Sequence, residues 1–287
     1  MTKNTSRPYI GGHVSVAGGL WNAFENAANI GAECIQIFGA NPRGYAAPMP
    51  LPVTLEKYHA ARKAHPEVKK VYLHAGYLVN LASPNPEAVE KSIENLSAHL
   101  RIAELLAADG LIFHIGSGKE MPKDQALKQV VVAMKKVLDK APGKANLLIE
   151  NAAGGGAKIG ADPTEIGEIM KGVGSLRVKV CIDTAHSFEA GLVEGYTKQN
   201  TKAFLKLWDD AVGLENVHAL HVNDSKTELN SHHDRHENIG EGFIGLEGFR
   251  NLAQSPELYD KAWLLEVPGF DETGPDKKNV AILKGLF

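Results

Sequence analysis

Eight short apolar runs, spread along the whole chain, constrain the fold of this protein more than any other feature of its sequence. Each run is almost continuously apolar, which is typical of parallel strands that are covered on both faces. The runs are YIGGHVS, ECIQIFG, KVYLHAG, GLIFHIG, NLLIENA, VKVCIDTAH, VHALHVND and AWLLEVPG. We therefore predict eight buried, parallel strands.

Helical patterns separate these runs. The clearest covers residues 86–108, and it begins at Asn85 and Pro86, a good cap followed by a good first helical residue. A second start lies at Asp162-Pro163, with Glu165 placed as in a capping box. Eight strand–helix units of about 36 residues each fit one (β/α)8 TIM barrel. Since no linker or low-complexity segment interrupts the chain, we expect a single domain over residues 1–287.

Acidic and histidine side chains end six successive runs at the same point. The successive positions are 33 to 45 residues apart, roughly one barrel unit, and the carboxyl ends of barrel strands carry active sites. A lone histidine after a strand is more often a core or loop residue, but six strands in succession are hard to explain in that way. The residues are His74, His114, Glu150, Asp183 with His186, His221 and Glu266.

The loop NSHHDRHENIGEG, residues 230–242, adds Asp234 and His236, which brings the number of candidate metal ligands to nine. Carboxylates that converge without partners are costly to bury, so this arrangement calls for a cation. Mixed histidine and carboxylate ligands suit zinc, with manganese or iron as alternatives. Because one ion takes about four to six ligands, nine indicate two or three ions. Clustered metal ions of this kind hydrolyse phosphoesters.

Composition sets weaker limits. The net charge of −3 gives no support to nucleic-acid binding, although three bound divalent ions would reverse its sign. Cys34 and Cys181 lie in apolar runs, which predicts two buried thiols in a reducing compartment. The N-terminal residues lack the apolar segment of a signal peptide, and no run approaches the ~18 residues of a membrane span. We expect a soluble, cytoplasmic protein that contacts no membrane.

Three segments resemble, in order, the signature segments of the endonuclease IV family: CIDTAHSFEAG, HVNDSK and DRHENIGEG. The segments GGHVSVAGGL, LHAGYLVNLA, FHIGSG and IENAAGGG resemble other strand ends of that family, so the similarity runs from about residue 9 to about residue 270. This family of apurinic/apyrimidinic (AP) endonucleases belongs to the xylose isomerase-like TIM barrels. The resemblance implies a base excision repair hydrolase that cuts 5′ to an abasic site, leaving a 3′-hydroxyl and a 5′ deoxyribose phosphate.

The resemblance also implies a trinuclear zinc centre, with manganese as an alternative at one or more sites. Three sets of ligands are implied: His74, His114 and Glu150; Glu150, Asp183, His221 and Glu266; and His186, Asp234 and His236. Glu150, which is shared by the first two sets, would be the catalytic residue that orients a metal-bound hydroxide, the nucleophile, or accepts the proton of the bound water from which that hydroxide forms. Zinc lowers the pKa of bound water toward neutrality, and the third ion would stabilise the leaving oxygen.

The implied partner is double-stranded DNA that contains an abasic site, bound by a monomer. The family inserts side chains into the minor groove and flips the abasic nucleotide out. Arg43, Tyr77 and Leu78 stand at the matching positions, and Lys226 and Arg235 are candidates for phosphate contacts. On the residues alone, Arg43 would be a surface charge and Tyr77 a packing aromatic.

One segment departs from the family pattern. This chain has ANPRGY where members commonly carry a run similar to KNPRQW, so Ala40, Gly44 and Tyr45 replace a lysine, a glutamine and a tryptophan. Gly44 lacks the long side chain that would fill the gap left in the duplex. We expect this difference to affect the strength of DNA binding and the substrate range, and to leave the metal chemistry unchanged.

The remaining histidines predict less. We expect His232 and His233 to lie in a solvated loop, and His13 either to support the site or to pack in the core. His59, His65 and His99 fall on helical stretches and are expected at the surface. The glycines of NAAGGGAKIG lack the pattern of a nucleotide P-loop and favour a tight turn beside the metal site.

Two other functions compete. A single-metal sugar isomerase or epimerase of the xylose isomerase-like barrels would use Glu150, Asp183, His221 and Glu266, but it has no use for the five other candidate ligands. A damage-binding protein without turnover would fit a chain with substituted ligand positions, and none of the nine is substituted.

Overall fold

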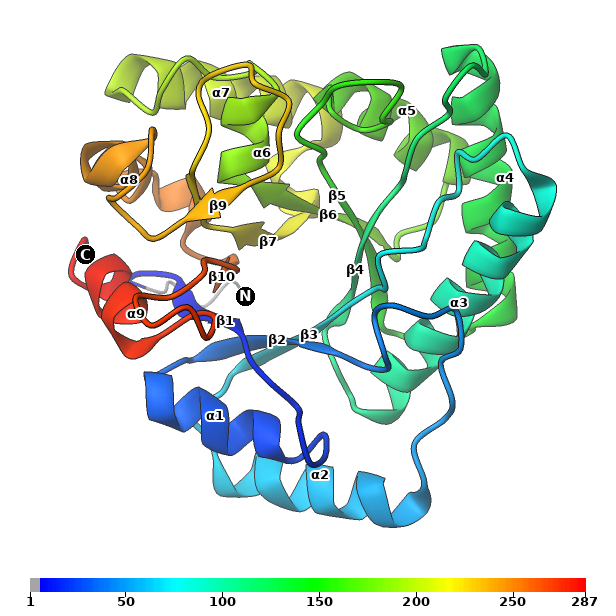
Figure 1. Ribbon diagram of the computed structural model, residues 1–287, viewed down its shortest axis with the longest axis horizontal. Coiled ribbons are helices and arrows are strands. Elements are labelled where there is room, and N and C mark those ends of the chain that lie inside the picture. The colour runs from blue at the N-terminus through cyan, green and yellow to red at the C-terminus, as the bar shows by residue number, and fades with distance from the viewer. Residues whose placement is uncertain (1–5) are drawn as a thin grey trace.

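The computed structural model describes residues 6–287 as a closed barrel of eight parallel strands (Figure 1). Each strand pairs with its neighbours along the chain, and the last pairs with the first. The strands are β1 (Tyr9–His13), β2 (Cys34–Phe38), β3 (Lys70–His74), β4 (Gly110–His114), β5 (Asn146–Glu150), β6 (Val178–Asp183), β7 (Val217–His221) and β10 (Ala262–Leu265). Each predicted apolar run contains one of them, so the predicted TIM barrel is confirmed.

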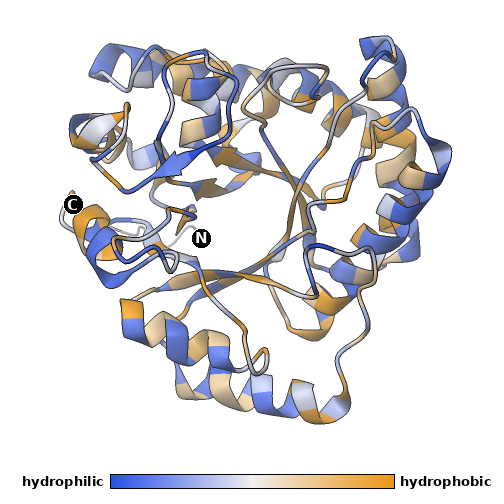
Figure 2. Ribbon diagram, in the orientation of Figure 1, coloured by the Kyte–Doolittle hydropathy of each residue, from blue (hydrophilic) through white to orange (hydrophobic). Residues whose placement is uncertain are grey.

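Helices surround the ring of strands, as Figure 1 shows. They are α1 (Asn22–Ile30), α2 (Pro52–Ala64), α3 (Pro86–Leu105), α4 (Lys123–Lys140), α5 (Pro163–Val173), α6 (Thr184–Glu189), α7 (Lys198–Val212), α8 (Gly245–Leu252) and α9 (Lys277–Lys284), with short 3₁₀ turns at Leu214–Asn216 and Pro256–Leu258. The central strands are hydrophobic, whereas the helices are polar on their outer faces (Figure 2). None of the helices in residues 6–287 is both long and apolar enough to cross a membrane.

The predicted helix starts are confirmed. The side chain of Asn85 accepts a hydrogen bond from the Glu87 amide at 2.9 Å, and Asp162 accepts one from the Thr164 amide at 2.9 Å. The capping box at Glu165 is wrong, because its carboxylate accepts from the Gly160 amide instead and pairs with Lys123. Glu165 therefore holds the preceding loop rather than its own helix start.

Side chains fill the interior of the barrel. Both predicted thiols, Cys34 and Cys181, are free and fully buried there, and burial raises the pKa of Cys181 to about 11. The others in this cluster are Tyr72, Ile112, Leu148, Ala219, Ala262 and Leu264. The interior is therefore packed, and the space for chemistry lies at its carboxyl end.

One expectation about the surface is wrong. His99 is only 1% exposed, because its face of α3 packs against the barrel near Gly39. Its Nδ1 donates to the Asn95 carbonyl oxygen one turn earlier. His59 is exposed and His65 is half-buried, closer to what the sequence predicts.

Candidate metal centre

All nine predicted metal ligands gather at the carboxyl end of the barrel. Six of them line a cleft of about 1140 Å³: His74, His114, His186, Asp234, His236 and Glu266. The other three, Glu150, Asp183 and His221, are fully buried at the strand ends. Strand pairing brings them together, since His114 pairs with Glu150 and Asp183 with His221 across adjacent strands.

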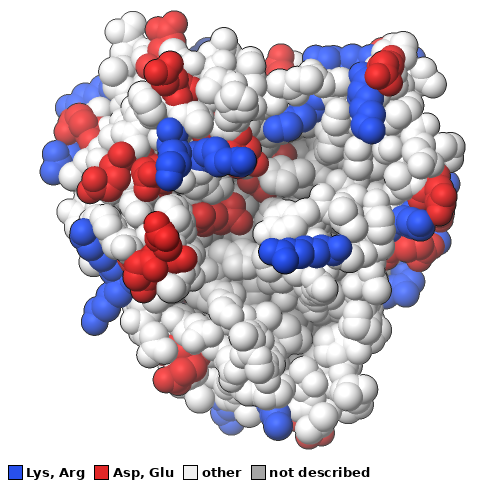
Figure 3. All heavy atoms as spheres, in the orientation of Figure 1, with Lys and Arg blue, Asp and Glu red and all other residues white. Residues whose placement is uncertain are grey.

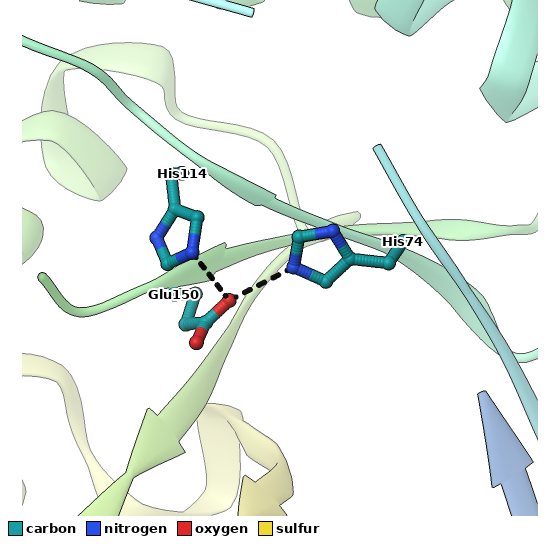
Figure 4. Close-up of side chains that lie close together, drawn as sticks. All are labelled: His74, His114 and Glu150. Carbon is teal, nitrogen blue, oxygen red and sulfur yellow. Dashed lines mark hydrogen bonds and ion pairs between the residues drawn. The ribbon is translucent and has the colours of Figure 1, made fainter. Parts of the chain in front are cut away.

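The first group joins β3, β4 and β5. Glu150 Oε2 lies 3.0 Å from His74 Nε2 and 3.3 Å from His114 Nε2 (Figure 4). The other ring nitrogen of His74, Nδ1, donates to the Ala75 carbonyl oxygen at 2.8 Å. This bond fixes Nδ1 as a donor and makes Nε2 the nitrogen that faces the site, as in many metal-binding histidines.

The second group lies around the other oxygen of Glu150. His221 Nδ1 is 2.9 Å from Glu150 Oε1, 3.2 Å from Glu266 Oε2 and 3.9 Å from Asp183 Oδ2. Its Nε2 donates to Gln36 Oε1 at 2.7 Å, which again leaves one nitrogen facing the carboxylates. Glu150 is thus shared by two groups whose ligand atoms are close enough to hold a metal ion.

The third group combines His186 of α6 with Asp234, which lies in the loop between β8 (Asp224–Ser225) and β9 (His236–Glu237), and with His236, the first residue of β9. Asp234 Oδ1 lies 3.3 Å from His186 Nε2 and 3.7 Å from His236 Nε2. The Nδ1 atoms of these histidines face the carbonyl oxygens of Asn151 and Glu266. Both Nε2 atoms are buried without a hydrogen bond, a costly state that a bound cation would relieve. The donor set therefore fits a metal ion.

The electrostatics agree with a cation site. Burial by itself would raise the pKa of Glu150, but the neighbouring His114, His221 and His186 lower it well below its usual range. Burial would lower the pKa of His221, yet its acidic neighbours, Glu150 among them, raise it well above its usual range. Without a metal ion, the charge on Glu150 is therefore balanced by a proton on His221. A bound ion would replace that proton.

Three supporting residues were missed in the sequence. Gln36 is fully buried in β2 and donates to Glu266 Oε1 at 2.6 Å while it accepts from His221. Asn151 directly follows β5, and its side-chain oxygen accepts a hydrogen bond from the Asp183 amide at 2.7 Å. Asn223 lies just after β7, and its side-chain amide donates to Asp183 Oδ2 at 2.7 Å. The sequence signal that could have revealed these three residues is an amide side chain inside an apolar run or just after it. His13 lies beside Gln36 and 3.8 Å from Glu266, so it supports the site.

Asp224 explains another part of the signature segments. Its buried carboxylate accepts hydrogen bonds from the amides of Gly240, Gly242, Ile244 and Gly245. It therefore holds the turn that follows β9. Gly242 has to be glycine, because a Cβ there would lie 2.3 Å from the Ser225 carbonyl oxygen.

Of the predicted DNA-binding residues, Tyr77 lines the cleft, and Arg43 and Leu78 lie next to residues that line it. Tyr77 and Leu78 are 68% and 43% exposed, and Arg43 is also exposed. The Tyr77 amide donates to the Pro42 carbonyl oxygen at 2.9 Å, so these residues lie on adjacent, connected loops.

Lys226 and Arg235 face each other across the base of the β8–β9 loop, where the Lys226 amide donates to the Arg235 carbonyl oxygen. Both side chains are exposed, and Lys226 Nζ lies 3.6 Å from Glu237. In Figure 3, basic side chains flank a hollow that contains acidic ones. This separation suits a ligand that is anionic at its edges and that meets a metal at its centre.

The two other loop histidines, His232 and His233, are exposed, as expected. His232 lies against the glycine turn at 154–156, and a Cβ on Gly154 would lie 2.6 Å from its ring. All three glycines have positive φ, so the predicted tight turn is present.

Comparisons with known proteins extend this picture. The family model described as a Xylose isomerase-like TIM barrel matches residues 24–285. A protein named Probable endonuclease 4 from Halothermothrix orenii is 35% identical over 281 residues, which cover 96% of this chain and 99% of the relative. Its namesake from Aquifex aeolicus is 35% identical over 280 residues and 97% of both chains.

Solved structures give the same result. Endonuclease IV from Thermus thermophilus superposes with a TM-score of 0.85 at 33% identity, over 97% of this chain and 98% of that one. A D-tagatose 3-epimerase-like protein superposes with a TM-score of 0.73 at 18% identity, over 97% and 96%. The second similarity shows a common fold alone.

Proposed function

This chain belongs to the endonuclease IV family of DNA-cleaving hydrolases, and from that premise we propose that it is an AP endonuclease. It would hydrolyse the phosphodiester 5′ to an abasic site and leave a 3′-hydroxyl and a 5′ deoxyribose phosphate. One observation carries the proposal: ligand atoms at the carboxyl end of the barrel form four groups that are each close enough to hold a metal ion, and Glu150 belongs to two of them.

Three zinc ions fit these groups, with manganese as an alternative. His74, His114 and Glu150 would hold one ion, and Glu150 with Asp183, His221 and Glu266 a second. His186, Asp234 and His236 would hold the third. Bound there, divalent ions supply an activated water at neutral pH and stabilise the attacking and leaving oxygens of a phosphodiester.

Glu150 is the residue that we assign to catalysis. It is fully buried, its two oxygens face opposite sets of imidazoles, and its charged form is strongly favoured. It would orient the attacking water and accept its proton. Gln36, Asn151 and Asn223 would hold the ligands in place through the hydrogen bonds described above.

The rim would hold the DNA. Tyr77 and Leu78 present exposed apolar surface beside the metal groups, which suits insertion into the minor groove at a damaged step. Arg43 lies on the connected loop, and Lys226 and Arg235 would bind phosphates on the opposite rim. We propose that the protein acts as a monomer, as a single domain and in the cytoplasm.

A single-metal sugar epimerase is the second candidate. Glu150, Asp183, His221 and Glu266 form one of the candidate metal groups by themselves, and the fold is shared with an epimerase-like protein. The five further ligand-type side chains in the same cleft favour the nuclease.

A duplex with one tetrahydrofuran abasic analogue tests the proposal. This analogue cannot undergo β-elimination, so a nick has to come from hydrolysis. We expect a nick on its 5′ side that leaves a 3′-hydroxyl. Binding without a nick, in protein that holds three ions, would indicate a damage-binding protein. About one ion per chain and no nick would favour the epimerase, and sugars would be tested next.

A further inference from the structure

We propose that Glu189 is a tenth metal ligand, which binds the ion of the third group through its Oε2 atom. The inference rests on the proposed function, since it adds a carboxylate to the site formed by His186, Asp234 and His236. Glu189 is the last residue of α6 and follows His186 by three positions.

The position of Glu189 supports this role. Its ligand atom and those of His186 and Asp234 all lie within 4.8 Å of one another, and they form a candidate metal group. The ligand atoms of a tetrahedral zinc ion are about 3.3 Å apart, given bonds of about 2.0 Å, so small movements would bring the three into contact with one ion.

Of the two carboxylate oxygens of Glu189, only Oε2 lacks a hydrogen-bond partner. Glu189 is fully buried, and Oε2 has no hydrogen bond. Among residues 6–287, three of the nine buried side-chain atoms without a partner belong to His186, Glu189 and His236. A buried carboxylate oxygen without a partner is costly, and a cation beside Asp234 would satisfy both Glu189 Oε2 and His186 Nε2.

A purely structural role explains the other oxygen. Oε1 accepts hydrogen bonds from Ser225 Oγ at 2.8 Å, and from Thr227 Oγ1 and the Arg235 amide at 3.3 Å. These bonds anchor the β8–β9 loop to α6. They leave Oε2 unexplained, so the anchor and the ligand are separate roles of one side chain.

Together the two roles connect the ion to the loop. The backbone carbonyls of Phe188 and Glu189 also accept hydrogen bonds from the loop, from Asn230 and His232. Binding of an ion at Oε2 would therefore order the segment that carries Lys226 and Arg235. The sequence signal is Asp183, His186 and Glu189 at intervals of three, which places them on one side of a short helix.

Metal retention tests this inference without any use of activity. Purified full-length protein, loaded with zinc, is equilibrated with graded chelator, and the zinc bound per chain is measured by mass spectrometry. Glu189→Gln keeps an oxygen for the loop donors and removes the charged Oε2. We expect the variant to lose its third zinc equivalent at a chelator strength about 10- to 100-fold lower than the wild type needs, and to hold the other two equivalents as the wild type does.

Two control variants separate the roles. Glu165→Gln changes another buried carboxylate that anchors a loop, but one in no candidate metal group, so it should retain three equivalents as the wild type does. Ser225→Ala removes a loop donor and keeps the carboxylate, so it should also retain the third equivalent. Loss in Ser225→Ala equal to that in Glu189→Gln would make loop disorder the cause and overturn the inference.

The other outcomes are equally clear. Superimposable curves for Glu189→Gln and the wild type, each with three equivalents, overturn the Glu189 role and leave the proposed function intact. A wild type that never holds more than one equivalent overturns both. If Glu189→Gln does not fold, a structure of the zinc-loaded wild type decides: an Oε2–zinc distance of about 2.0–2.2 Å supports the inference, and one beyond about 3 Å overturns it.

Discussion

The candidate metal centre has two parts that are built differently. His74, Glu150, Asp183 and His221 sit on barrel strands and are at most 6% exposed. Asp234 stands on the β8–β9 loop, and its side chain is 47% exposed. Strand ligands are fixed by the register of a closed ladder, whereas the loop ligand depends on a few side-chain and backbone bonds to α6.

This difference predicts different strengths of metal binding. A preorganised set loses little conformational freedom when an ion binds, whereas an exposed side chain on a loop loses more. We therefore expect the strand-held ions to be the stable part of the centre and the loop-held ion to exchange first.

The largest effect is expected at the residue shared by two strand groups. Glu150→Gln keeps the shape of the side chain and removes the charge between two ions, so turnover on abasic duplex should fall by roughly 10³-fold or more. Single-turnover cleavage of the tetrahydrofuran duplex measures it. The circular dichroism spectrum should match that of the wild type, and cleavage at the wild-type rate would remove Glu150 from catalysis.

His236→Ala tests the part that is built on β9 and on the loop before it. On the proposed assignment of three ions, it should lower turnover by about 10²-fold, because it would remove only the ion that would stabilise the leaving oxygen. Zinc content should fall from three equivalents to two, and those two should resist chelator as in the wild type.

The comparison fails if the order is reversed. His74→Ala is the matched strand variant, because it removes the same imidazole from a buried position. Each variant identifies the ion that its missing histidine would bind. If chelator removes the ion identified by His74→Ala from the wild type before the ion identified by His236→Ala, the strands do not hold the more stable ions.

Much of this architecture could be predicted from the sequence. Parallel strands buried on both faces leave near-continuous apolar runs, and a barrel places the residue that ends each run at one rim. His74 and Glu150 were therefore predictable before their 3.0 Å contact was known. The ion assignments came from family resemblance and stay predictions.

Tertiary contacts between distant segments were not predictable. Glu165 has the spacing of a capping box, but a loop amide and Lys123 compete for its carboxylate. His99 lies on α3, where several polar side chains are buried together with the apolar ones, so its polarity does not indicate exposure. The hydrogen-bond partners of Glu189 come from Ser225 and Arg235, 36 and 46 positions further along the chain, which its spacing from His186 does not reveal.

The loop that follows β3 gives a second comparison with the β8–β9 loop, because backbone hydrogen bonds hold it to the adjacent loop, which contains Pro42. Tyr77→Ala removes an exposed aromatic ring there, and stacking on such a ring contributes about 1–3 kcal/mol. We expect affinity for abasic duplex to fall about 10-fold, measured by fluorescence anisotropy, with zinc content unchanged. Unchanged affinity would make Tyr77 a packing residue.

The smallest effect concerns Tyr45, which stands where the family commonly has tryptophan. Its hydroxyl donates to the Leu78 carbonyl oxygen at 2.9 Å, and its own carbonyl accepts from Asn95 at 2.8 Å, so it supports the loop of Tyr77 and Leu78 from behind. Tyr45→Phe removes only the first of these bonds, which is worth about 1 kcal/mol at most. We expect KM for abasic duplex to rise by up to about fivefold while kcat stays constant. A fall in kcat at unchanged KM would place Tyr45 in the chemistry, whereas a rise in KM alone would show that Tyr45 acts by supporting the residues that bind DNA.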